Sequence, residues 1–91
     1  MGSSTGPIGD DELRAIRARV DAASPSPWTA FIGGGLGGPE FIRVSDDDAE
    51  PDMYVERDGA PASSADLDFI ASARQDIPRL LDEVERLRAA E

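Results

Sequence analysis

The chain has 91 residues, which suffice for one small domain and leave no room for a second hydrophobic core. It contains no cysteine, histidine or lysine, which excludes disulfides, thiolate and imidazole metal sites, Ser-His-Asp catalysis and Schiff-base chemistry. The net charge of −10 comes from 19 acidic residues against nine arginines, and such a field opposes binding to nucleic acid and to anionic membranes.

The first residues carry no sign of a folded element or of a targeting signal. Residues 1–9 are small and polar, which predicts a disordered tail before a single domain over residues 10–91. No positive charge precedes an apolar run, as it would in a signal peptide, and no apolar stretch is long enough to cross a bilayer. We therefore expect a cytoplasmic protein.

A first helix is predicted over residues 11–23. Asp10 is a suitable N-cap, and the two acidic residues after it suit the positive end of the helix dipole. The apolar positions that share one helical face are Leu13, Ile16 and Val20. The helix should end before the segment Ser-Pro-Ser-Pro at 24–27, because proline cannot continue it.

Three short strands are predicted after this helix, at residues 28–32, 40–44 and 53–57. The third ends at Asp58-Gly59, a strong turn signal. Trp28 opens the first strand, where we expect it to cap the core; the alternative is a stacking platform for a ligand.

The stretch FIGGGLGGPE holds five glycines and matches the pattern G-x-G-x-x-G at Gly33, Gly35 and Gly38. A dinucleotide fingerprint requires a helix after the last glycine, so that the helix N-terminus faces the pyrophosphate. Residues 40–44 alternate as a strand instead. We therefore interpret the run as a hairpin loop.

The segment SDDDAEPD at 45–52 is dense in carboxylates and suggests a calcium loop. Pro51 stands where the EF-hand pattern needs glycine, so we expect a solvated acidic loop and at most a weak cation site. Carboxylates are too numerous to single out a catalytic pair, and we expect neither an enzyme nor a bound cofactor.

The C-terminal region predicts a long helix capped by Ser63 or Ser64. Pro78 predicts a break or kink near residues 75–76, with Asp76 able to cap a second piece over 77–90. One apolar stripe follows heptad spacing: Ile70, Ala73, Ile77, Leu80, Val84 and Leu87.

These elements predict an α+β fold: an N-terminal helix, a small antiparallel sheet of two or three strands and a long kinked C-terminal helix. The residues expected to meet in the core are Trp28, Phe31, Phe41, Ile42 or Val44, Phe69 and Ile70. Such a small sheet cannot cover the whole C-terminal stripe, so we expect the stripe to self-associate, giving a dimer.

Two arginines in the predicted strands, Arg43 and Arg57, are candidate contacts for an anionic ligand, together with Trp28. The plainer interpretation is that both arginines point outward and pair with neighbouring acids.

Two segments resemble small phage accessory proteins of the Ead-like family. VDAASPSPW at 20–28 is similar to that family's alanine-rich helix end followed by Ser/Thr-Pro-x-Pro-Trp, and residues 65–89 resemble its C-terminal segment. The resemblance covers about a third of the chain and lies in packing residues. It implies a helix–sheet–helix scaffold of phage or prophage origin and assigns no catalytic residue.

Three functions follow as hypotheses. The first is a non-enzymatic phage-type accessory protein that binds a host protein or a second copy of itself. The second is a module that sequesters a small ligand such as a nucleotide signal, with Trp28, Arg43 and Arg57 around a cleft of an oligomer. The third is an acidic mimic of nucleic acid that occupies the basic groove of a DNA-binding protein.

Overall fold

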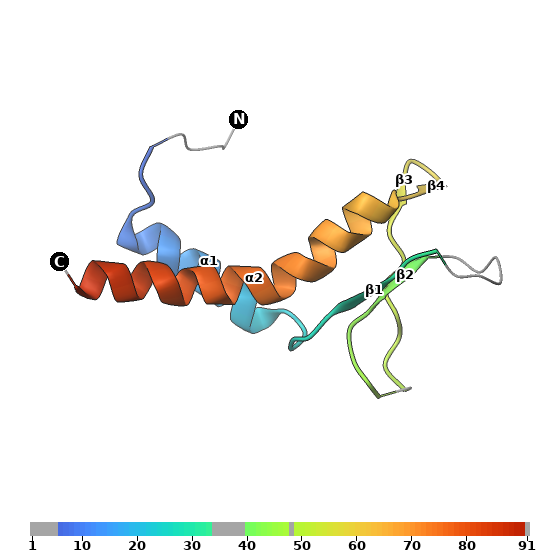
Figure 1. Cartoon of the computed structure of the whole chain (residues 1–91), viewed down its shortest axis with the longest axis horizontal. Coiled ribbons are helices and arrows are strands. Elements are labelled where there is room, and N and C mark those ends of the chain that lie inside the picture. Colours follow the sequence, from blue (N-terminus) through green and yellow to red (C-terminus); the bar gives the residue numbers. More distant parts are fainter. Residues whose placement is uncertain (1–5, 34–39, 48, 91) are drawn as a thin grey trace.

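A computed structural model describes residues 6–33, 40–47 and 49–90. Over these residues, two helices and two small two-stranded antiparallel sheets form the α+β architecture that the sequence predicts (Figure 1). The elements in chain order are α1 (Asp10–Ala22), β1 (Thr29–Phe31), β2 (Phe41–Arg43), β3 (Glu56–Arg57), β4 (Ala60–Pro61) and α2 (Ser64–Ala89).

Helix α1 lies one residue earlier than the sequence predicts at both ends. Gly9 is its N-cap, and the Gly9 carbonyl accepts a hydrogen bond from the Leu13 amide at 3.0 Å, so Asp10 already belongs to the first turn. Residues 1–5 of the predicted tail lie outside the described residues. Within 6–9, the Ile8 carbonyl accepts a hydrogen bond from Arg88 of α2, which ties this segment to the end of the chain.

Strands β1 and β2 pair antiparallel, with Phe31 opposite Phe41 and Thr29 opposite Arg43. A third segment joins at Met53, whose amide and carbonyl both hydrogen-bond to Ile42, at 2.8 and 2.9 Å. The predicted strand over 53–57 is therefore split: its start extends the β1–β2 sheet, and its end forms β3. Because successive residues alternate between faces, the inner row is Ala30, Ile42 and Met53.

The Asp58-Gly59 turn forms as predicted. Both residues have positive φ, 50° and 86°, and Arg57 pairs with Ala60 across them. This is the type I′ geometry that matches the twist of the two strands. The turn brings Ala62 back onto the core, where its amide donates to the Val55 carbonyl at 2.9 Å.

Helix α2 begins with a capping box, which decides between the two predicted caps. Ser63 accepts a hydrogen bond from the Asp66 amide, and the Asp66 carboxylate accepts one from the Ser63 amide. The sequence predicts a break or a kink near 75–76, and the structure has the kink: α2 is one continuous helix in which Asp76 is an interior residue and not a cap. Its axis changes direction near the middle (Figure 1), as proline inside a helix requires.

The core is small and lies between the sheet and the first half of α2. Ile42 and Leu67 are fully buried, and half-buried residues including Trp28, Val44 and Ile70 surround them. In the described residues the buried hydrophobic side chains are Leu13, Ile42, Ala62, Leu67, Ala71 and Leu81.

Three predicted core residues are wrong. Phe41 lies on the outer face of the sheet and does not pack with the core cluster. Phe31 is 45% exposed because it lies on the outer face of the sheet, opposite the row that contains Ile42. Phe69 is 75% exposed because it follows Leu67 by two residues, and two residues turn a helix by about 200°.

The molecule is elongated. Helix α1 lies beside the C-terminal half of α2, and the sheet packs at the N-terminal half (Figure 1). The radius of gyration is 16.1 Å, whereas about 12 Å is expected for a compact domain of this length. Helices and sheet thus leave extended surfaces uncovered.

Candidate interaction surfaces

One side of the α1–α2 pair is closed by ion pairs. Arg17 donates to Asp82 and Glu85, both at 2.9 Å, and Arg88 pairs with Asp10 at 2.6 Å. The hydrogen bonds to Glu85 and then to Asp82 raise the pKa of Arg17 above its ordinary value. These contacts fix α1 antiparallel to the second half of α2.

The other side of the same helix pair is apolar and open. A groove of about 240 Å³ runs along it, lined mainly by Ile16 and Val20 of α1 and by Ile70, Ala73 and Ile77 of α2. Farther along α2, Leu80 and Leu87 of the predicted stripe are exposed apolar residues. We define the helical apolar face as Ile16, Val20, Ile70, Ala73, Ile77, Leu80, Val84 and Leu87.

The predicted C-terminal stripe thus forms most of the helical apolar face. Ile77, Leu80 and Leu87 are 39%, 62% and 53% exposed, and the remaining stripe residues are half-buried. The face is therefore only partly covered by α1.

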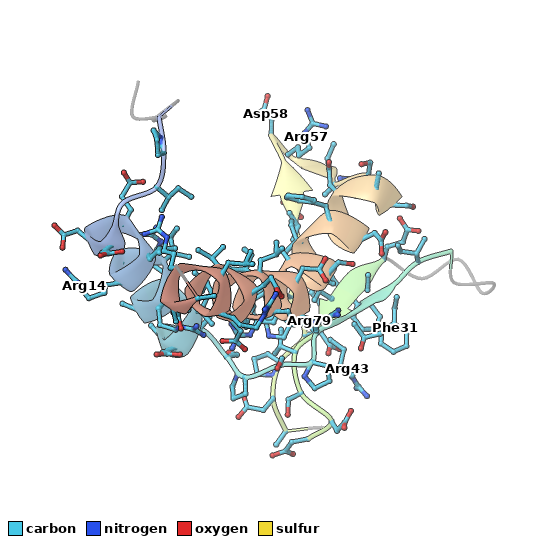
Figure 2. The ribbon with its side chains drawn as sticks, turned by 60° about the vertical axis from the view of Figure 1, so that its left-hand side comes forward. Arg14, Phe31, Arg43, Arg57, Asp58 and Arg79 are labelled. Atoms are coloured by element: carbon cyan, nitrogen blue, oxygen red, sulfur yellow. The ribbon has the colours of Figure 1, made fainter. Side chains whose placement is uncertain are left out.

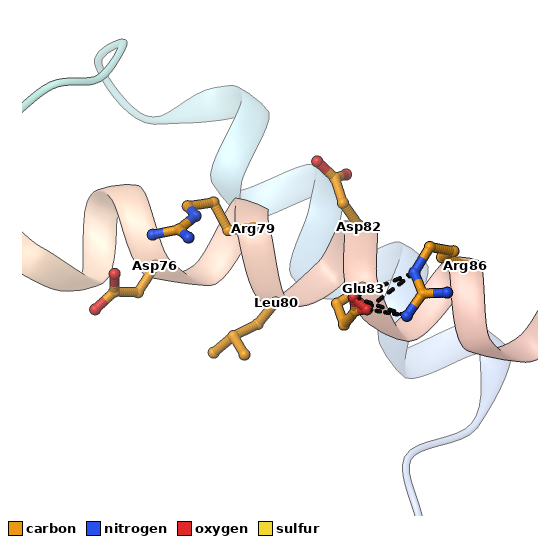
Figure 3. A pocket seen from close by; sticks show the side chains of 6 residues that line it. All are labelled: Asp76, Arg79, Leu80, Asp82, Glu83 and Arg86. Carbon is orange, nitrogen blue, oxygen red and sulfur yellow. Dashed lines mark hydrogen bonds and ion pairs between the residues drawn. The ribbon is translucent and has the colours of Figure 1, made fainter.

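Charged residues surround Leu80 in a shallow hollow of about 720 Å³. Figure 3 shows Leu80 between Asp76 and Arg79 on one side and the ion-paired Glu83 and Arg86 on the other, where Nε of Arg86 lies 2.9 Å from a Glu83 carboxylate oxygen. Acidic and basic groups alternate along this part of α2, so a copy of the same surface could pair with it.

The outer face of the sheet carries a row of three aromatic rings. Phe31 and Phe41 stack with centroids 5.1 Å apart, and Tyr54 lies 5.6 Å from Phe41 on the other side. Phe31 is 45% and Tyr54 57% exposed. We call Phe31, Phe41 and Tyr54 the aromatic row; in Figure 2 the labelled Phe31 points away from α2.

Arg43 lies on the same outer face, next to the aromatic row, and its Nε is 3.5 Å from the Asp52 carboxylate. Trp28 precedes β1 and packs on the inner side against the core, as the core-capping interpretation predicts. The Gln75 side-chain amide accepts from the Trp28 amide at 2.9 Å and donates to its carbonyl at 3.2 Å, as a neighbouring strand would.

Arg57 lies on the β3–β4 hairpin, where it is largely exposed and pairs with Asp66 at 3.6 Å. The three candidate ligand contacts therefore lie apart: Trp28 is inside, Arg43 is on the outer sheet face, and Arg57 is at the hairpin. The fold does not bring them into one cleft.

The glycine run connects two paired strands. Residues 34–39 lie outside the described residues, but β1 precedes the run and β2 follows it, which is the hairpin arrangement and not a strand–helix phosphate site. Glu40 joins the base of this hairpin to α2: its carboxylate accepts from the Gly33 amide at 2.7 Å and from the Ser64 hydroxyl at 3.0 Å.

The acidic loop is held by local hydrogen bonds in its described part. The Asp47 carboxylate accepts from the Ala49 amide at 2.9 Å, and the Ser45 hydroxyl accepts from the Asp47 amide at 3.0 Å. Within 6–33, 40–47 and 49–90, no three carboxylates converge in a geometry that could hold a metal ion.

The comparisons with known proteins identify no relative: no protein-family model, no curated protein and no solved structure matches the chain. Over the residues that the structure describes, neither helix combines the length and the hydropathy needed to span a bilayer. The two exposed surfaces on which a function can rest are the helical apolar face and the aromatic row.

Proposed function

We propose that the chain is a non-enzymatic accessory protein that acts by protein–protein binding and works as a homodimer. In the dimer, the helical apolar face of one copy packs antiparallel against the same face of the second copy. The observation that carries this proposal is the exposure of Ile77, Leu80 and Leu87 on the apolar stripe of α2, of which Ile77 lines the groove beside α1.

The small core supports a second copy. Six hydrophobic side chains are buried among the described residues, and two of them are alanines, so one copy gains little from apolar burial. Packing two α1–α2 pairs together would form a bundle in which the leucines of the helical apolar face leave water. Dimerisation thus supplies stability that the single chain lacks.

The charge distribution supports an antiparallel arrangement. Helices α1 and α2 carry ten acidic residues and seven arginines, a net of −3, whereas residues 28–58 carry eight acids and two arginines, a net of −6. An antiparallel pair keeps the two strongly negative sheet segments at opposite ends. A parallel pair would place them together, with Asp76 and Glu83 against their own counterparts.

The resemblance of residues 20–28 and 65–89 to Ead-like phage accessory proteins is the ground for expecting a host protein as the further partner. Within one chain the separation of Trp28, Arg43 and Arg57 gives no small-ligand cleft, because a nucleotide needs convergent polar groups, so this alternative requires a second copy to complete the site.

Copurification of two differently marked copies tests the dimer. Because the chain has no histidine, a copy with an added hexahistidine tag can be coexpressed with an untagged copy and captured on nickel. We expect the untagged copy to be retained in comparable amount. The untagged copy alone is the control and should wash through. If it also washes through in the presence of the tagged copy, the homodimer is wrong.

A further inference from the structure

We infer that the outer face of the sheet binds an arginine-bearing segment of a partner protein, with the aromatic row as the contact surface. The inference rests on the proposed protein-binding function but not on the dimer, because it concerns a different surface. Three properties of the sheet support this inference. The rings are exposed, the segment that carries them is strongly negative, and no helix of the described residues covers the outer face.

The aromatic row is a preformed platform. Phe41, the central ring, is half-buried and fixed by its neighbours on both sides, Phe31 at 5.1 Å and Tyr54 at 5.6 Å. The two outer rings are 45% and 57% exposed. Backbone pairing of β1, β2 and Met53 holds the three rings on adjacent strands. Binding of a ligand would therefore cost the protein little side-chain entropy at these rings.

The outer face stays open because the core uses the other side. Ile42 faces Leu67 and Ala71 of α2, and α1 lies farther along α2 (Figure 1). In the described part of the chain, no helix covers Phe31 or Tyr54. Exposed rings grouped in this way mark an interaction site more often than scattered apolar residues do.

The net charge of the segment that carries the row favours a cationic partner. The segment 28–58, which contains all three rings, has eight acids against two arginines, so it holds more than half of the chain's net charge. Its exposed carboxylates include Asp46, Asp47 and Glu50 in the loop that leaves β2. A cationic segment is attracted to this face, whereas an anionic segment or a phosphate is repelled.

Arginine fits the surface better than lysine. A guanidinium group is planar, stacks on aromatic faces and can bind a carboxylate with two hydrogen bonds at the same time. The row offers the faces, and Asp52 lies two residues from Tyr54 on the same outer face, where it pairs with Arg43. An arginine of the partner that stacks on Tyr54 would lie on the same sheet face as the Asp52 carboxylate.

Fluorescence polarisation with short labelled peptides tests this inference. The probes are three peptides of equal length in which glycine alternates with arginine, with lysine or with glutamate. We expect the arginine peptide to bind most tightly, the lysine peptide more weakly and the glutamate peptide not at all. Absence of binding by the arginine peptide, or equal binding of the arginine and lysine peptides, would overturn the inference.

Substituted chains separate ring stacking from general attraction to a negative protein. The double variant Phe31→Leu/Tyr54→Leu keeps apolar side chains and charge but removes two ring faces, and it should weaken arginine-peptide binding about tenfold. The control Phe69→Leu removes an exposed ring on α2 and should leave the affinity unchanged. Equal affinity of the double variant and the unsubstituted chain would also refute the role of the row.

The variant Leu80→Asp distinguishes failure of this inference from failure of the dimer. Leu80 lies on α2, whereas the aromatic row lies on the outer face of the sheet, so Leu80→Asp should bind the arginine peptide as the unsubstituted chain does. A large loss of peptide affinity in Leu80→Asp would contradict the assignment of binding to the sheet. Circular dichroism of each variant confirms that the fold is retained.

Discussion

Replacing Leu80 with aspartate should turn the dimer into a monomer. Leu80 is 62% exposed in the single chain, so the folded monomer accommodates a charge there at little cost. In the proposed dimer, the same position would be buried against the second copy, and each unpaired carboxylate would lose its hydration. We expect the dissociation constant to rise at least a hundredfold, corresponding to about 3 kcal/mol, as measured by size-exclusion chromatography with light scattering.

The matched control for Leu80→Asp is Tyr54→Asp. Tyr54 is similarly exposed, at 57%, and the substitution adds the same charge, but on the outer face of the sheet. Tyr54→Asp should remain dimeric at the concentrations at which Leu80→Asp is monomeric. An unchanged dimer in Leu80→Asp, or equal dissociation of both variants, would show that the helical apolar face is not the interface.

Replacing Leu67 with alanine should cause the largest loss of folding stability from a single substitution in α2. Leu67 is 1% exposed and packs with Ile42, Ala62 and Ala71 in the main core cluster. Removing a leucine from such a site typically costs about 3–5 kcal/mol, against a total stability of about 5–14 kcal/mol for a domain of this length. The loss is measured as a shift of the urea midpoint in chemical denaturation.

Phe69→Ala provides the comparison for Leu67→Ala on the same turn of α2. Phe69 is 75% exposed, so its replacement should change the unfolding free energy by about 0.5 kcal/mol or less. If Phe69→Ala instead costs as much as Leu67→Ala, then α2 presents the wrong face to the sheet and the core described above is incorrect. This pair tests the rotation of α2 directly.

Local signals in the sequence were sufficient for most of the elements. Proline at 25 and 27 ends α1, and Asp58-Gly59 has the φ angles that its two-residue hairpin needs. The Ser63–Asp66 capping box fixes the start of α2. Each signal acts within a few residues, so its effect can be predicted without knowledge of the tertiary structure.

The rotation of α2 could not be predicted in the same way. Its buried row follows heptad spacing through Leu67, Ala71 and Leu81, but Arg74 and Pro78 occupy the two positions between them. In the sequence, an arginine and a proline therefore interrupt the apolar residues of the buried row. The neighbouring stripe from Ile70 to Leu87 is entirely apolar, so the sequence favours the stripe as the buried face. Arg74 is tolerated because it lies between the helices and donates to the Val20 carbonyl at 3.0 Å.

Tertiary contacts also explain why α2 continues through Pro78. Proline removes one backbone hydrogen bond and bends the axis, which by itself favours a break. Leu67 anchors the helix to the sheet on one side of the bend, and Leu81 is buried near α1 on the other. These tertiary contacts hold both halves in one helix, and sequence patterns do not encode their strength.

The aromatic row was also missed, although a signal for it exists. Phe31 and Phe41 flank the glycine run, and pairing across a hairpin places them opposite each other. From the sequence, both phenylalanines are predicted to lie in the core, because large apolar residues are usually buried. Only the register with Ile42 shows that this pair faces outward.

The sedimentation equilibrium mass of the unsubstituted chain tests the central claim most directly. The chain has a mass of 9.7 kDa, and a homodimer formed through the helical apolar face predicts a species of twice that mass across the micromolar range, dissociating only on dilution. A mass that stays at 9.7 kDa at every concentration would contradict the account.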